Sequence, residues 1–302
     1  MPVVGLISHT EIVQSAIDAL ALGSLYSLYA LGIALVFSVM GLINFAHGEL
    51  IMIGGFALAL LVGVMPLGIV LVVVAVVVVL AALTMERVAF RPVRGADPAT
   101  LLITSFAVSY LLQNLAILIF GATPRTLSLG SWLGGSFTIA GNTVQHLSVA
   151  TVIATAVLLA ALVLFLGRTA LGLRMRAAAE DFRMARLLGV RANRVIATAF
   201  AISGLLAAAG SVFLVAQTGT VTPDMGLTAI LFAFMAAILG GIGSLPGAVA
   251  GGYLLGITTV LFQVWLPFSL RPYRDAFVFG VVFVVLVLRP QGLIPTRGHI
   301  RV

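Results

Sequence analysis

Long stretches without a charged residue are the feature that most constrains how this chain can fold. Seven of them cover most of the sequence: residues 19–48, 50–85, 98–124, 126–167, 195–223, 225–270 and 276–288. About 20 apolar residues cross the hydrocarbon core of a bilayer, so several stretches are long enough for two spans. Because only 8% of the residues are charged and 62% are apolar, the chain lacks the polar surface of a soluble globule. The sequence predicts an integral membrane protein.

The spans are predicted to be helices. Residues 69–83 are apolar on every side, whereas a membrane-spanning strand alternates between apolar and polar residues. The expected fold is all-α, a polytopic transmembrane bundle of about eight to nine spans, some of them broken or short. We expect one transmembrane domain over residues 1–302. Residues 1–18 contain Glu11 and Asp18 but no basic residue, so we expect the first helix to be retained and not cleaved as a signal.

All sixteen basic residues are arginine, and thirteen of them fall in three segments: residues 87–94, 168–194 and the tail 289–302. Positive charge favours the cytoplasmic side, so we expect the N-terminus outside and the C-terminus in the cytoplasm. The absence of lysine excludes a standard P-loop ATPase site, and the absence of cysteine excludes thiolate chemistry. The four histidines are scattered, so we expect neither a metal site nor a catalytic site.

Three polar residues, Asn44, His47 and Glu49, interrupt the apolar sequence between Gly41 and Gly55. A helix over residues 50–64 would be only about 22 Å long. A helix that begins at Asn44 would be about 31 Å long, with Asn44 as a plausible N-cap. His47 and Glu49 are two positions apart and do not share a helix face, which weighs against a joint site. Two interpretations stay open: a broken helix that lines a polar path, or a structural cluster at the cytoplasmic boundary.

Other polar or flexible positions are weaker candidates for a translocation pathway. Gln113 and Asn114 interrupt an apolar span, where interhelical hydrogen bonding is the default explanation. The glycine run at residues 240–247 predicts a break between two helices, so Gly241 and Gly243 could line a path or form a plain turn.

The loop 168–194 carries seven arginines against Glu180 and Asp181. Positions 178, 181, 185 and 188 recur at helical spacing, which predicts a short helix parallel to the membrane. Such a loop can fix topology, touch anionic lipid, or dock an ATPase.

Four blocks, residues 41–56, 91–114, 179–190 and 238–256, together resemble the shorter permease subunit of branched-chain amino-acid ABC importers. The family also includes permeases for urea and short amides. The resemblance implies a multi-pass protein of the bacterial inner membrane. It also implies a second related permease, a periplasmic solute-binding protein and two cytoplasmic ATPases, which bind ATP and Mg²⁺, so that this chain needs no cofactor. An ATP-independent channel or a secondary transporter is the alternative from another class.

The resemblance also implies a role for residues 177–190 as the ATPase-coupling loop. Ala185 and Gly189 match the alanine and glycine of that loop, and Arg183 stands where other importers have glutamate. Glu180 or Asp181 is then the acidic contact. The full set of candidate coupling residues is Glu180, Asp181, Arg183, Ala185, Arg186, Leu188 and Gly189.

Overall fold

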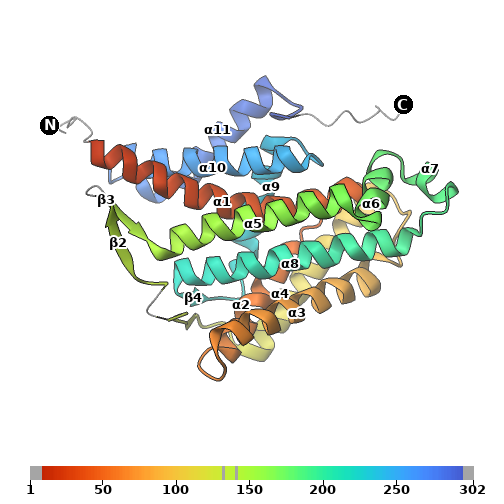
Figure 1. Ribbon diagram of the computed structural model, residues 1–302, viewed down its shortest axis with the longest axis horizontal. Helices are drawn as coiled ribbons and strands as arrows, with labels where there is room; N and C mark the ends of the chain where they lie inside the picture. The colour runs from red at the N-terminus through yellow and green to blue at the C-terminus, as the bar shows by residue number, and fades with distance from the viewer. Residues whose placement is uncertain (1–8, 131–132, 140–141, 295–302) are drawn as a thin grey trace.

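The structure is a computed structural model that describes residues 9–130, 133–139 and 142–294. Within these residues the predicted all-α bundle is confirmed (Figure 1). The helices are α1 (His9–Met40), α2 (His47–Leu61), α3 (Leu67–Met85), α4 (Pro98–Phe120), α5 (His146–Arg168), α6 (Ala170–Glu180), α7 (Phe182–Leu187), α8 (Ala192–Thr218), α9 (Met225–Gly240), α10 (Leu245–Trp265) and α11 (Arg274–Leu288). The N-terminal residues 1–8 and the tail residues 295–302, with Arg297, His299 and Arg301, lie outside the described residues.

Six of these helices, α1, α3, α4, α5, α8 and α10, are long and apolar enough to cross a membrane. The helices α2 and α9 are apolar but shorter, at 15 and 16 residues. The expectation of short or broken spans therefore agrees with the helix lengths, while the number of crossings stays a prediction.

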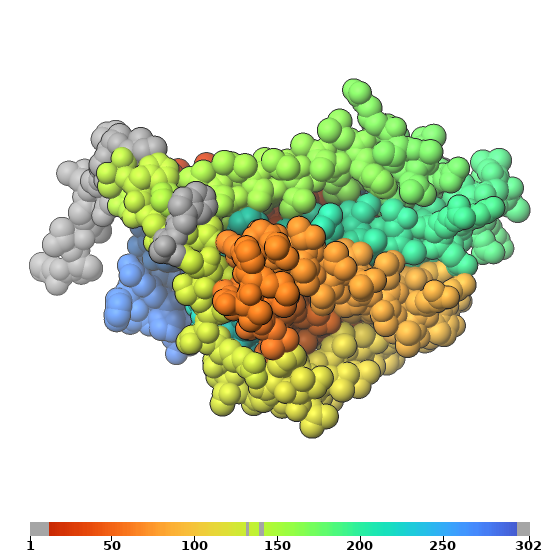
Figure 2. All heavy atoms as spheres, turned by 60° about the horizontal axis from the view of Figure 1, so that its bottom comes forward, coloured from red at the N-terminus to blue at the C-terminus, as the bar shows by residue number. Residues whose placement is uncertain are grey.

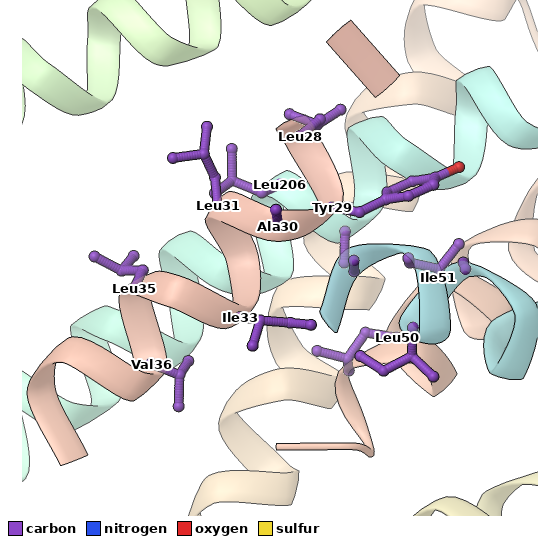
Figure 3. Packing of buried hydrophobic residues seen from close by; sticks show 14 of the residues in the cluster. Leu28, Tyr29, Ala30, Leu31, Ile33, Leu35, Val36, Leu50, Ile51 and Leu206 are labelled. Atoms are coloured by element: carbon purple, nitrogen blue, oxygen red, sulfur yellow. The ribbon is translucent and has the colours of Figure 1, made fainter. Parts of the chain in front are cut away.

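The helix α1 is the centre of the bundle. In its most apolar window 78% of the residues are buried, against 17% in α4 and 22% in both α3 and α5. Figure 3 shows Leu28, Leu31 and Leu35 of α1 near Leu206 of α8, and Leu50 and Ile51 of α2 close by. The outer helices leave most of their apolar side chains uncovered, as expected where lipid or another membrane chain is the neighbour.

Small residues allow α1 and α10 to pack backbone to backbone. A Cβ added at Gly252 would lie 2.4 Å from the backbone nitrogen of Ser27, and one at Gly256 would lie 2.4 Å from that of Gly23. Small residues four apart on both helices give such close packing in membranes. Gly23 and Ser27 of α1 therefore lie in direct contact with the backbone of α10.

The segment between α3 and α4 is only partly a loop. Residues Glu86–Phe90 continue α3 as a π-helical turn, η1, in which the Arg91 amide donates to the Glu86 carbonyl at 2.7 Å. Turns follow, and Asp97 caps α4 by accepting from the Thr100 amide at 2.8 Å.

Short strands join the loops at one end of the bundle (Figure 1). Strand β1 (Arg125–Thr126) pairs antiparallel with β4 (Thr220–Val221), and β2 (Ser136–Ile139) pairs with β3 (Asn142–Gln145).

The helices α6 and α7 lie at the opposite end from the strands (Figure 1). Arg94, in the loop before α4, donates to the side-chain oxygen of Asn193 in α8 at 2.6 Å and pairs with Glu86. Two of the three arginine-rich segments therefore meet at one end of the bundle.

The prediction that positions 178, 181, 185 and 188 lie on one short helix is wrong. The chain breaks at Asp181, whose extended backbone ends α6 and whose carboxylate caps α7 by accepting from the Met184 amide at 2.9 Å. Ala178 and Ala185 are buried, but Asp181 and Leu188 are exposed, so the four positions do not form one face.

Candidate functional site

The helix α2 begins inside the bundle. It starts at His47, with Ala46 at the N-cap and no side-chain cap, so the predicted helix start and N-cap at Asn44 are wrong. The length argument failed because it assumed that α2 has to cross the membrane as one regular helix. Residues 41–44 instead return from the end of α1 without helical structure, and a turn at Phe45 and Ala46 leads into α2.

The start of α2 is enclosed by other helices. Glycine meets glycine where α2 crosses the start of α9: a Cβ added at Gly48 would lie 2.3 Å from the carbonyl oxygen of Gly226. The three polar residues at this start, Asn44, His47 and Glu49, are at most 1% exposed. A polar group at this depth has to find partners within the protein.

His47 points toward α1 and α8. Its Nδ1 lies 3.0 Å from the Ser203 hydroxyl, which itself donates to the Gly32 carbonyl at 3.0 Å. A serine has only one hydroxyl proton, so His47 donates from Nδ1. Within the described residues Nε2 has no hydrogen-bond partner. Gly32 makes room for the ring, because a Cβ there would lie 2.4 Å from Nε2.

Glu49 points in another direction, toward α4. One carboxylate oxygen, Oε1, accepts from the Ser109 hydroxyl at 2.7 Å and from the Gln113 amide at 3.2 Å. The other oxygen, Oε2, is buried and has no partner among the residues that the structure describes. His47 thus contacts α1 and α8, whereas Glu49 contacts α4. This agrees with the argument from their spacing that the two residues do not form a joint site.

The side chain of Asn44 makes weaker hydrogen bonds than those of His47 and Glu49. Its amide donates only to the sulfur of Met85 at 3.9 Å, and its Oδ1 is buried without a partner in the described chain. Together with His47 Nε2 and Glu49 Oε2, it gives the start of α2 three buried polar atoms without partners. Such atoms are candidates for water or ligand contacts.

The helix α4 is attached mainly to α2 and η1. Its contacts with α2 and the turn before α2 form three layers: Phe45 stacks on Phe106, Glu49 accepts hydrogen bonds from Ser109 and Gln113, and Phe56 stacks on Phe120. The other side of α4 is uncovered (Figure 2).

The structure thus brings Gln113 to Glu49 but leaves Asn114 apart. Asn114 is exposed and donates to the Tyr110 carbonyl at 2.7 Å within α4. Sequence reasoning missed Ser109 and Ser203, since serines occur throughout the spans and only their tertiary contacts distinguish these two.

Gly241 and Gly243 form the turn between α9 and α10. Both have positive φ, of 110° and 84°, and Ser244 caps α10 by accepting from the Gly247 amide at 3.1 Å. Gly241 lies against the backbone of Ile294 and Gly243 against Phe37. No contact in the described chain joins them to the start of α2, so the geometry favours the plain turn.

The candidate coupling residues lie in and around α7. Ala185 is buried, and Gly189, with a φ of 85°, follows the end of the helix. Three apolar side chains are exposed there: Met184 by 54%, Leu187 by 78% and Leu188 by 79%. Glu180, Arg183 and Arg186 are exposed as well. This protruding, partly apolar helix has the composition of a docking surface.

Within the described residues no group of three or more His, Cys, Asp or Glu side chains could hold a metal ion.

The family model described as branched-chain amino acid transport system / permease component matches residues 15–287. The chain is 36% identical over 294 residues to the high-affinity branched-chain amino acid transport system permease protein BraD of Pseudomonas aeruginosa, covering 93% of this chain and 95% of that protein. It is also 36% identical over 296 residues to the permease protein LivH of the same kind of system in Escherichia coli strain K12, covering 93% and 94%.

One partial match is to a permease that is named for a different substrate. The autoinducer 2 import system permease protein LsrC of Yersinia enterocolitica is 32% identical over 134 residues, which are 42% of this chain and 36% of that protein. No solved structure matches the chain.

Proposed function

Since this chain belongs to the family of branched-chain amino acid transport permeases and is the permease component of such an ABC transport system, we propose that it lines the path by which leucine, isoleucine and valine enter the cell. The observation that carries the substrate class is the extent of the match. The two relatives named for branched-chain amino acids align over 93% of the chain, whereas the autoinducer permease aligns over 42%.

The transport system has further subunits in this proposal. A second related permease completes the path, a solute-binding protein delivers the amino acid, and two ATPases bind ATP and Mg²⁺, so this chain holds no cofactor. The location is the bacterial inner membrane, with the N-terminus outside and the C-terminus in the cytoplasm. Support comes from the arginine-rich segments that meet at one end of the bundle, since positive charge favours the cytoplasmic side.

In this proposal α7 transmits the conformational change of the ATPases to this chain. The exposed side chains of Met184 and Leu187 offer an apolar contact to an ATPase, and Asp181 and Gly189 fix the two ends of the helix. The start of α7 follows α6, which contacts α1, α5 and α8. A displacement of α7 is therefore passed to the central helix of the bundle.

The path runs along α2 and α4. The start of α2 carries the unpartnered atoms of Asn44, His47 and Glu49, and α4 exposes Tyr110 and Asn114 near the middle of its length. Polar groups at the middle of a span are unfavourable against lipid but suited to a water-filled path or a protein neighbour. A zwitterion with an apolar side chain needs few fixed charges on its way.

Uptake of labelled leucine by cells that express the chain with its partner subunits tests the proposal. We expect uptake that isoleucine and valine compete for and that a hundredfold excess of urea leaves unchanged. Uptake by reconstituted vesicles should require ATP and the ATPases. Uptake that persists without any ATPase would contradict the importer and support a channel or secondary transporter.

Leu187→Glu tests the coupling surface. We expect this variant to insert and fold normally but to lose most transport and most transport-stimulated ATP hydrolysis, because a charge replaces an apolar contact. Leu173→Glu is the matched control, since Leu173 lies on α6 and is 61% exposed. Equal losses in both variants would show a general effect of charge in this loop.

A further inference from the structure

A hollow of about 400 Å³ lies between α6, the end of α7 and the start of α8. Its lining residues are Arg174, Leu188, Gly189, Val190, Arg191 and Arg194. Half of them are arginines, and no acidic residue of the described chain lines the hollow. Three positive charges around one concave surface create a strong local field for an anion.

The three arginine side chains have no hydrogen bond or ion pair with any residue that the structure describes. Other arginines differ: Arg94 bonds Asn193 and pairs with Glu86, and Arg274 pairs with Asp275. The first turn of α8 adds to the field, because Arg191 at its N-cap provides no side-chain cap. The hollow therefore has a surplus of donors for an anion with several oxygens.

The hollow lies where the spans end. The helix α6 folds back onto the end of α5, so closely that a Cβ at Gly172 would lie 2.2 Å from the Phe165 carbonyl oxygen. Met175 and Ala178 are buried in this contact of α6 with the bundle. On the other side of the hollow, Arg194 directly precedes Val195, a buried residue of the span α8. Charged residues at such positions lie at the level of the lipid headgroups.

Apolar side chains complete the lining. Leu188 is 79% exposed and lies in the same hollow as the arginines, together with Val190. A free anion would use only the arginines, but a molecule with both a phosphate and acyl chains would use the whole lining. We propose that this hollow binds the phosphate headgroup of an anionic phospholipid, with its first acyl carbons against Leu188 and Val190.

This site gives lipid a direct contact with the energy-coupling segment. Leu188 and Gly189 immediately follow α7, so a bound lipid fixes the end of α7 relative to α8. The inference concerns the membrane and holds whichever amino acid is transported.

The test titrates the purified full chain with phosphatidylglycerol or phosphatidylcholine and counts bound lipid by native mass spectrometry. The variant is R174Q/R191Q/R194Q. The control is R87Q/R168Q/R176Q, which removes the same charge from exposed arginines that do not line the hollow. We expect wild-type protein and control to bind phosphatidylglycerol in preference to phosphatidylcholine. The variant should lose about fivefold in affinity for each arginine removed.

Three results would overturn the proposal. Equal losses in variant and control would show attraction to the whole surface instead of a site. Displacement of phosphatidylglycerol by millimolar inorganic phosphate would show a site for a free anion. Unchanged lipid binding in R174Q/R191Q/R194Q, with loss of ATPase assembly, would show that the hollow receives the partner protein. Thermal unfolding of all three proteins checks that each variant is folded.

Discussion

The contact between Gly32 and His47 shows how one missing side chain determines the site. The imidazole ring occupies the space that a Cβ at Gly32 would take, at 2.4 Å from Nε2 and 2.5 Å from Cε1. The ring in turn reaches Ser203 on α8. A glycine in α1 thus allows a polar side chain of α2 to be buried against two other helices.

We expect Gly32→Ala to lower the free energy of unfolding by about 1–3 kcal/mol, because the added methyl overlaps the ring. Thermal unfolding of the purified chain measures this. The control is Gly280→Ala in α11, where nothing lies within 4 Å of the added Cβ and little change is expected. In a His47→Ala background the Gly32→Ala penalty should nearly vanish, and a penalty that persists would locate the overlap elsewhere.

Asp97 gives a pH dependence to the start of α4. The hydrogen bonds from Thr100 hold the pKa of this carboxyl below its usual value of 3.8. Its contribution to stability is therefore fully present above about pH 4 and is lost as the pH falls through the lowered folded-state pKa.

We expect Asp97→Asn to unfold at a lower temperature than wild type at pH 7, because the neutral amide interacts less favourably with the helix N-terminus. The difference should shrink as the pH approaches 3. Melting curves between pH 7 and 3 check this, and a constant difference would contradict the assignment to Asp97.

At the scale of elements, the packing of α1 against α10 depends on a pair of small residues four positions apart on each helix. The pairs are Gly23 and Ser27 on α1 and Gly252 and Gly256 on α10. We expect Gly252→Ala and Gly256→Ala each to destabilise the chain by about 1–3 kcal/mol, since both added methyls meet backbone atoms. The double variant should lose less than the sum, because the first methyl already separates the helices.

Melting temperatures of the single and double variants measure this effect. Gly68→Ala in α3, where the added Cβ meets nothing within 4 Å, is the neutral control. If the two losses of stability add fully in the double variant, the contacts at Gly252 and Gly256 are energetically independent, which would contradict this expectation.

The positions of most helices were predictable from the sequence, and the reasons for the exceptions are physical. The stretches without charge at residues 98–124, 126–167, 195–223 and 225–270 cover nearly all of α4, α5, α8, α9 and α10. The start of α2 was misplaced because the length argument assumed one regular helix across the membrane, whereas residues far away in the sequence, such as Gly226, enclose this start. The break at Asp181 was missed because Ala178 and Ala185 keep helical spacing across it.

The candidate site was predictable only in its composition. Asn44, His47 and Glu49 were identifiable as polar residues in an apolar segment, and their spacing already separated His47 from Glu49. The partners Ser109 and Ser203 could not be found, because no local pattern distinguishes a serine that bonds across helices from one that bonds its own helix.

At the scale of the whole molecule, the proposed orientation is open to direct labelling because the natural chain has no cysteine. We expect a membrane-impermeant maleimide to label Phe268→Cys in intact cells, since Phe268 is 86% exposed in the loop between α10 and α11. It should label Leu187→Cys only after the membrane is opened.

The wild-type chain, which has no thiol, gives the background of this experiment. Labelling of Leu187→Cys from outside, with Phe268→Cys protected, would reverse the topology and place α7 out of reach of a cytoplasmic ATPase.

The central position of α1 has a consequence for how the protein is made. Helix α1 leaves the ribosome before α8, α9 and α10, which pack against it. Until those helices are inserted, the glycine and serine face of α1 has no permanent neighbour and has to be shielded by lipid or by the insertion machinery. A chain that stops before α10 therefore lacks the main neighbour of α1, and we expect membrane proteases to remove it although α1, α3, α4, α5 and α8 are each long and apolar enough to cross a membrane.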